Sequence, residues 1–199
     1  MVDVAHQNDV KVAMHANTLN AAVPYIGMVD SIEHGAGLHL NDQIKHLCGT
    51  NTTWVPTLSA YYTASSPDMW AGLQKGFKRA LQLGMDNIAC GGDTGVFNHG
   101  QNALEMKLMV RLGADYKKVL QWGTLGGWEC IRPVNWQETG GIGGDNDQWF
   151  GVLKAGWAAD LIAVDGDLDT DFEGTVDRVM FVMRGAKVYK LDGKEVNCL

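Results

Sequence analysis

The sequence has no long hydrophobic run, and its first residues do not have the pattern of a leader segment. No stretch approaches the roughly 18 apolar residues of a membrane span. The opening residues, MVDVAHQND, contain neither the positive region nor the apolar core of a signal peptide. We therefore expect no membrane partner and no signal peptide. This leaves the compartment open and favours a cytoplasmic location.

Positive charge is scarce, and the cysteines do not form a framework. Lys plus Arg is 16 and Asp plus Glu is 23, which gives a formal net charge of −7. An acidic chain without a basic cluster argues against nucleic-acid binding. Four scattered cysteines without a CxxC pair are typical of reduced thiols; they are Cys48, Cys90, Cys130 and Cys198.

What the chain does have is glycine and a regular alternation of patterns. Its 25 glycines indicate many tight turns. Short β-type runs alternate with helical spacing up to about residue 122, which is typical of a parallel sheet covered by helices. A closed (β/α)₈ barrel needs about 250 residues, which is more than this chain has. The four predicted units correspond to half of its eight. The predicted strands are 11–15, 29–34, 53–58 and 87–93, and the predicted helices are 18–28, 39–48, 67–83, 102–112 and 115–122.

The character of the sequence changes after Cys130. Residues 133–151 are rich in Gly and Trp and predict an irregular loop. Beyond it, predicted strands at 159–165, 178–183 and 187–190 are joined by turns at Arg184-Gly185 and Asp192-Gly193. The predicted organisation is therefore a half barrel at 1–132, the loop at 133–151 and a β-rich segment at 152–199.

Three polar residues stand at the ends of predicted strands, namely His15, His34 and Asp93. The carboxyl ends of parallel strands form the functional face of such sheets. Two imidazoles and a carboxylate suit a divalent metal such as zinc. Each residue alone also has a structural reading, as a hydrogen-bonded histidine or a helix cap. The coincidence of all three at strand ends is what predicts a metal site.

Several motifs, in order along nearly the whole chain, resemble the metal-dependent amidohydrolase superfamily, in particular its imidazolonepropionase-like and prolidase-like members. Residues 12–18 and 29–35 resemble strands five and six of that barrel. Residues 91–95 resemble its strand-eight aspartate motif. Residues 156–165 resemble the G-x-x-A-D-L return to a small β domain, and 179–190 resemble its closing strands.

The resemblance implies an α/β fold: a partial (β/α)₈ TIM barrel, strands five to eight, with a C-terminal β segment of a small composite β-sandwich domain. It implies a hydrolase in which metal-activated water attacks an amide, ester or related bond of a small-molecule or dipeptide-like substrate. His15 and His34 would bind the metal, most expectedly zinc, and Asp93 would be both a ligand and the general base. His99 would help to bind substrate, or be an ordinary loop histidine.

The sequence also departs from the family pattern. Its six histidines contain no His-x-His pair, and the resemblance begins at strand five. The chain would hold one metal site or none by itself. Two readings stay open: a hydrolase that is active only when its barrel and metal site are completed, and a non-catalytic fragment or scaffold. Open strand edges predict a homo-oligomer or a complementing N-terminal half.

Overall fold

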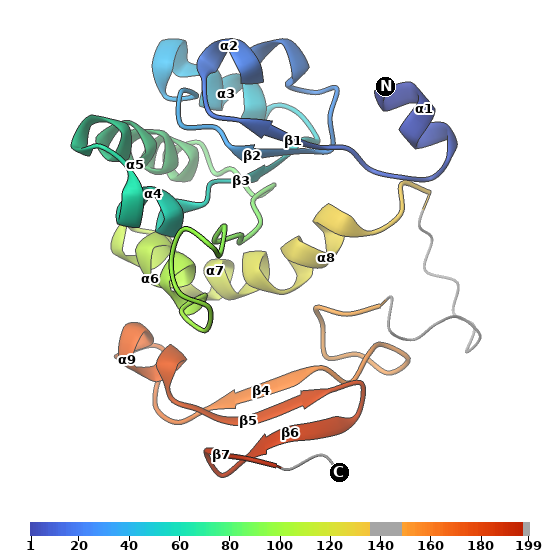
Figure 1. Ribbon diagram of the computed structural model, residues 1–199, viewed down its shortest axis with the longest axis vertical. Coiled ribbons are helices and arrows are strands. Elements are labelled where there is room, and N and C mark those ends of the chain that lie inside the picture. The colour runs from blue at the N-terminus through green and yellow to red at the C-terminus, as the bar shows by residue number, and fades with distance from the viewer. Residues whose placement is uncertain (136–148, 197–199) are drawn as a thin grey trace. The chain divides into compact units, whose positions relative to one another are not determined.

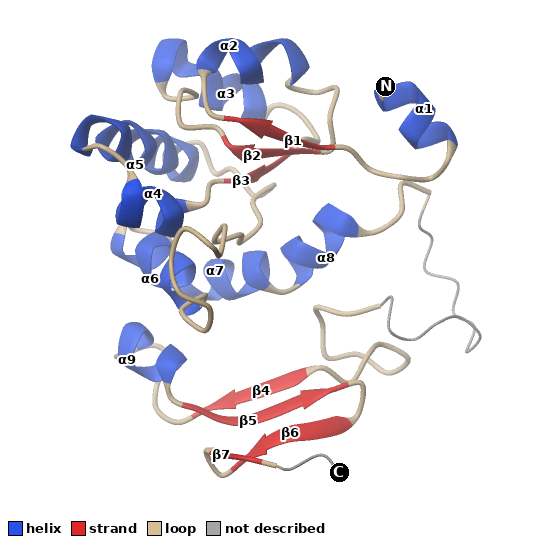
Figure 2. Ribbon diagram, viewed as in Figure 1, coloured by secondary structure: helices blue, strands red, loops and turns tan. Residues whose placement is uncertain are grey.

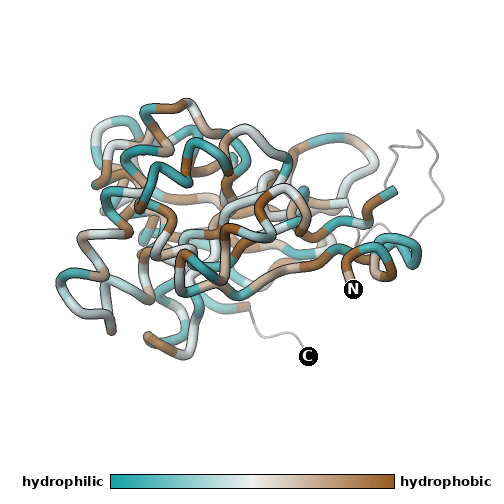
Figure 3. Tube along the Cα trace, turned by 90° about the horizontal axis from the view of Figure 1, so that it is seen from above, coloured by the Kyte–Doolittle hydropathy of each residue, from teal (hydrophilic) through white to brown (hydrophobic). Residues whose placement is uncertain are grey.

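The computed structural model describes residues 1–135 and 149–196, and the chain divides into two compact units, Met1–Trp136 and Gln137–Leu199 (Figure 1). Most of the predicted loop 133–151 lies outside the described residues. Hydrophobic and hydrophilic residues are interspersed along the trace (Figure 3). No helix in the described ranges is long and apolar enough to cross a membrane.

A parallel sheet forms the centre of the first unit. It contains β1 (Ala13–Ala16), β2 (Ser31–His34) and β3 (Thr53–Val55) in the order β1-β2-β3. These strands confirm the first three predicted ones. The third ends at Val55, three residues earlier than predicted, because Pro56 has no N–H to donate to a neighbouring strand and a helix begins at Leu58.

The prediction of a fourth strand at 87–93 is wrong. This segment makes one isolated parallel bridge, between Ile88 and Trp54. The Trp54 N–H donates to the Asn87 carbonyl at 2.8 Å, and the Ala89 N–H donates to the Trp54 carbonyl at 3.0 Å. The next amide, that of Cys90, donates to the Trp122 carbonyl instead. The chain therefore leaves the sheet before Asp93.

Helices surround this sheet (Figure 2). Three predicted helices are confirmed to within two residues at each end, and two others are shorter than predicted. The segment 18–28 breaks into an α-helix and a 3₁₀ turn at Pro24, and 39–48 begins with a 3₁₀ turn. Three helices of the first unit, α1, α4 and α8, are not predicted. The helical elements are α1 (Val2–Gln7), α2 (Leu19–Ala22), η1 (Val23–Tyr25), η2 (Leu40–Asp42), α3 (Gln43–Cys48), α4 (Leu58–Ala64), α5 (Pro67–Gln82), α6 (Ala103–Arg111), α7 (Tyr116–Gly123) and α8 (Leu125–Ile131).

The two faces of the sheet differ. Ile32 and Trp54 are fully buried, and the indole of Trp54 packs against Phe77 of α5 at a centroid distance of 6.3 Å. By contrast, Ala13 and His15 on alternate positions of β1 are exposed. Because side chains alternate along a strand, one face of β1 carries the core and the other stays open.

The second unit contains an antiparallel sheet, with β4 (Leu161–Val164), β5 (Val179–Arg184), β6 (Lys187–Leu191) and β7 (Lys194–Glu195) in that order. The three predicted strands are confirmed. The predicted turn at Asp192-Gly193 is confirmed, whereas the other turn is Gly185-Ala186, one residue later than predicted, because Arg184 still pairs with Lys187. Both turns have positive φ at their two central residues, as type I′ turns require. A short helix, α9 (Phe172–Asp177), was not predicted.

Candidate metal site

The structure brings His15 and His34 together at the carboxyl ends of β1 and β2. Their ring centroids are 4.5 Å apart, and His34 Nε2 lies 2.9 Å from His15 Nδ1. His34 is buried, with 7% of its surface exposed, whereas His15 is exposed. Strict alternation would place His34 on the opposite sheet face from Glu33. The positive φ of His34, 72°, breaks that alternation at the strand end.

Three further side chains hold the two rings. The Thr57 hydroxyl lies 2.7 Å from His34 Nδ1, and the Asn17 amide nitrogen lies 2.8 Å from His15 Nε2. The Tyr61 hydroxyl in turn donates to the Asn17 amide oxygen. Sequence reasoning missed all three residues. The strand-end rule that selected the histidines could have found Thr57, since it lies two residues after the end of β3.

Asp93 acts on this cluster through its charge. Burial lowers the pKa of His34 and the neighbouring His15 lowers it further, while the negative charge of Asp93 opposes both effects. Burial also raises the pKa of Tyr61, and Asp93 adds to that rise. Asp93 itself is exposed and has a positive φ of 57°. His99 lies exposed in the turn that follows.

The histidine pair meets part of the requirement of a metal site. Two imidazoles meeting nitrogen to nitrogen are a donor set that zinc uses. Within residues 1–135 and 149–196, however, no three His, Cys, Asp or Glu side chains lie close enough together to hold a metal. Asp93 therefore does not complete a three-ligand group with the histidines. A catalytic zinc has three protein ligands, so the described residues fit two positions and lack the third.

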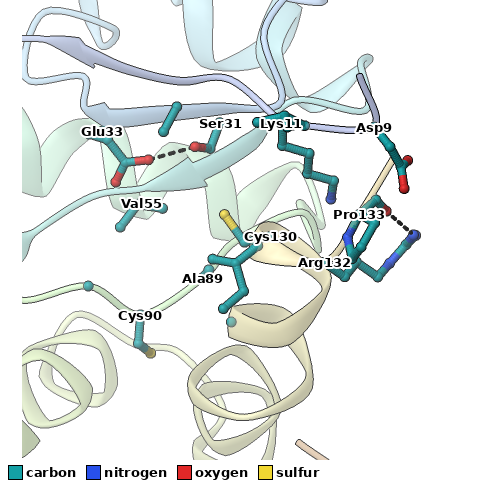
Figure 4. A pocket seen from close by; sticks show the side chains of 15 residues that line it. Asp9, Lys11, Ser31, Glu33, Val55, Ala89, Cys90, Cys130, Arg132 and Pro133 are labelled. Atoms are coloured by element: carbon teal, nitrogen blue, oxygen red, sulfur yellow. Dashed lines mark hydrogen bonds between the residues drawn. The ribbon is translucent and has the colours of Figure 1, made fainter. Parts of the chain in front are cut away.

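A cavity of about 560 Å³ opens on the sheet (Figure 4). Its walls include the apolar residues Val55 and Ala89. They also include Glu33, which the sequence did not predict as a site residue. The Ser31 hydroxyl donates to the Glu33 carboxylate at 2.6 Å. Burial raises the pKa of Glu33, and the Ser31 hydrogen bond opposes that rise. The cavity thus contains one half-buried acid, Glu33, and its walls combine apolar side chains with the charged side chains of Asp9, Lys11 and Arg132.

Comparison with known proteins identifies the fold. No protein-family model and no curated protein matches the chain. Among solved structures, it is similar to a Xaa-Pro dipeptidase with methionine bound in its active site, with 27% identity, a TM-score of 0.76 and coverage of 95% of this chain and 47% of that one. It is also similar to the ochratoxinase of A. niger, with 22% identity, a TM-score of 0.73 and coverage of 96% and 44%.

A third similar structure is the atrazine chlorohydrolase of Arthrobacter aurescens in complex with zinc, with 16% identity, a TM-score of 0.64 and coverage of 99% and 48%. These proteins are members of one superfamily. The same relationship is implied by the sequence motifs around His15, His34 and Asp93. The chain therefore resembles the amidohydrolase superfamily in its fold, and it spans about half the length of the solved structures that it matches.

Proposed function

We propose that the chain forms part of a metal-dependent hydrolase in which His15 and His34 bind one divalent metal, for which zinc is the expected ion. The observation that carries this proposal is the contact between the two rings, 2.9 Å from nitrogen to nitrogen, at the ends of adjacent parallel strands. Its support from comparison is the similarity to a zinc-bound chlorohydrolase and to a dipeptidase. The substrate would be a small molecule or dipeptide-like compound with an amide, ester or related bond.

The residues of the chain would divide the work. A metal held by His15 and His34 would supply a water molecule of lowered pKa as the nucleophile. Asp93 is an exposed carboxylate whose negative charge acts on His34, and it would accept the proton of that water. To serve as a further ligand as well, its carboxylate would have to lie closer to the two histidines in the completed site than it does in this chain. His99, exposed in the turn after Asp93, would contact the substrate.

We infer that β1, β2, β3 and the 87–93 segment correspond to strands five to eight of the amidohydrolase barrel. The antiparallel sheet would then belong to the small β domain. Since the chain covers about half of each matched structure, the remaining ligands would come from the other half. The single bridge at Ile88 is consistent with an eighth strand that needs its missing neighbour to become regular.

Zinc titration by calorimetry tests the metal proposal. We expect the chain to bind zinc weakly and each of His15→Ala and His34→Ala to abolish that binding. His46→Ala is the matched control, because His46 is an exposed histidine on α3, and it should bind as the wild type does. Equal zinc binding by all four proteins would overturn the assignment of His15 and His34.

Hydrolysis assays test the catalytic part. With two adjacent ligands, the isolated chain should not hydrolyse Xaa-Pro dipeptides measurably. Addition of the part of the dipeptidase that this chain does not cover should give chelator-sensitive turnover. Asp93→Asn in the mixture should reduce the rate by about 100-fold or more, as expected for loss of a general base. Robust turnover by the chain alone would show that the two histidines and Asp93 suffice.

A second candidate function is a non-catalytic scaffold that keeps the fold. The observation that favours it is the lack of a third ligand beside the histidine pair in the described part of the chain. A scaffold would bind the complementing half without zinc binding and without turnover. The calorimetric titration, repeated on the mixture, separates the two functions.

A further inference from the structure

The two histidines belong to an unbroken series of hydrogen bonds, here termed the relay. It joins the end of β1 to the segment between β3 and α4. Its contacts are those from Tyr61 to Asn17, from Asn17 to His15 at 2.8 Å, between His15 and His34 at 2.9 Å, between His34 and Thr57 at 2.7 Å, and from Thr57 to the Pro56 carbonyl at 2.8 Å.

The last contact sets the direction of the relay. A carbonyl oxygen can only accept, and the Thr57 hydroxyl has one proton. With that proton on the Pro56 carbonyl, the Thr57 oxygen must accept a hydrogen bond from His34 Nδ1. Thr57 is buried, with 3% of its surface exposed, which leaves water little access to the hydroxyl.

The tautomers of both histidines follow from this direction. A neutral imidazole has one N–H and one lone pair, so His34 with its proton on Nδ1 has its lone pair on Nε2. That lone pair accepts from His15 Nδ1–H. The lone pair on His15 Nε2 then accepts from the Asn17 amide, and the Asn17 oxygen accepts from Tyr61. Every donor meets one acceptor.

The opposite direction is the competing arrangement. It would need the Thr57 proton to leave the Pro56 carbonyl for His34 Nδ1, and the Asn17 amide to be turned over. Both histidines would then carry their protons on Nε2. The two arrangements differ in which nitrogen of His34 is protonated, and that difference can be measured.

We propose that Thr57 is a positioning residue that holds His34 in its Nδ1–H tautomer and thereby directs the Nε2 lone pair toward His15. In the metal-free chain this lone pair accepts from His15 Nδ1–H, so a metal bound by both rings would have to displace that proton. The tautomer is independent of any metal; its consequence for metal binding rests on the proposed function. A metal-binding histidine usually donates its second nitrogen to an oxygen acceptor, and loss of that acceptor typically weakens metal binding 10- to 100-fold. Thr57, which follows the end of β3, supplies such an acceptor to His34.

Solid-state ¹⁵N NMR of the metal-free, histidine-labelled chain tests the tautomer at about pH 8, where a histidine of ordinary pKa is neutral. The His34 signals are assigned by their loss in His34→Asn. We expect the wild type to show protonated Nδ1 and unprotonated Nε2 at His34. Thr57→Val, which keeps the β-branched shape but has no acceptor, should lose this fixed tautomer. Thr57→Ser should retain it.

Thr63→Val is the matched control, because the Thr63 hydroxyl donates to the Ser59 carbonyl within α4 and lies outside the relay. It should leave the His34 signals unchanged. Wild-type His34 protonated on Nε2, or an unchanged Nδ1–H tautomer in Thr57→Val, would overturn the inference. If the tautomers are as inferred but the wild type binds no zinc, the proposed function fails and the role of Thr57 in fixing the tautomer stands. If zinc binds, Thr57→Val should weaken it about 10- to 100-fold.

Discussion

At the scale of single residues, Glu105 links the site to the helices behind it. It lies on α6 and is 1% exposed. Its carboxylate accepts hydrogen bonds from the Leu58 N–H at 2.9 Å, the Ser59 N–H at 2.7 Å and the Ser59 hydroxyl at 2.7 Å. These donors belong to the first turn of α4, which begins directly after Thr57. Glu105 therefore anchors the segment that presents Thr57 to His34.

Burial gives Glu105 a pH-dependent effect on stability. It raises the pKa of the Glu105 carboxyl from an ordinary 4.5 to about 7, with the hydrogen bonds from Ser59 and Leu58 opposing the rise. A carboxyl whose pKa is higher in the folded state contributes full stability below the unfolded pKa and loses it as the pH rises through the folded pKa. The contribution of Glu105 should therefore fall by about 3 kcal/mol between pH 4.5 and pH 8.

Chemical denaturation of the wild type and Glu105→Gln across this pH range isolates that contribution. Glutamine keeps the size of the side chain but cannot ionise. We expect the free energy of unfolding of the variant to gain on that of the wild type by about 3 kcal/mol as the pH rises from 4.5 to 8. Parallel pH profiles for the two proteins would show that Glu105 does not titrate differently in the folded state.

Strand-end position was a sufficient signal for some site residues and not for others. His15 and His34 follow short β-type runs, so their meeting at one sheet edge could be expected from local pattern. Glu105 gives no such signal, because its role depends on α6 packing against α4, where its hydrogen-bond partners lie 46 and 47 residues earlier in the chain. Contacts of this length are set by tertiary packing rather than by local spacing.

At the scale of elements, α5 shows why glycine can occupy the interior of a helix. Gly72 and Gly76 both lie on its buried face, next to His39. A Cβ atom at Gly72 would lie 2.6 Å from His39 Cε1, whereas one at Gly76 would lie 3.6 Å from His39 Cβ. The His39 ring is held by a 2.9 Å contact between its Nδ1 and the Ala36 carbonyl. Of these two positions, only Gly72 requires glycine, because the His39 ring lies too close for a Cβ atom there.

The two glycines make a matched pair of substitutions. Gly72→Ala should lower the free energy of unfolding by about 1–3 kcal/mol, because the methyl group forces His39 or α5 to move. Gly76→Ala should leave it unchanged or raise it by up to about 1 kcal/mol, since alanine favours the helix. Urea denaturation of both variants measures the difference. Equal effects would mean that the His39 ring turns aside without penalty.

The same helix shows what local pattern could predict among the elements. Ser66 before Pro67 is a start signal, and the Ser66 hydroxyl accepts from the Met69 N–H in the structure. Its amphipathic spacing made α5 predictable to within one residue. The segment 87–93 offered a β-type run, but a strand also needs several consecutive backbone pairs with a neighbour. Its short run has Trp54 on one side, and the sequence could not reveal that pairing would stop at a single bridge.

At the scale of the whole molecule, the sheet of the first unit has an open edge. Among the described strands, β1 pairs with β2 alone. The carbonyls of Val12 and Ala16 accept from residues 31 and 35. Backbone groups alternate in direction along a strand, so those of Ala13 and His15 point away from β2. The exposed face of β1 adds unburied surface next to this edge.

We expect the isolated chain to associate at micromolar concentration, because an unpaired strand edge templates pairing with another chain. Ala13→Pro tests the edge directly: proline removes an N–H that points away from β2, and it is tolerated at the first residue of an edge strand. Sedimentation velocity should show the wild type heavier than one chain and Ala13→Pro shifted toward the monomer, with similar thermal unfolding of both. Addition of a complementing half should compete with self-association, since both need the same edge. A wild-type chain that stays monomeric and melts cooperatively would show that this edge needs no partner.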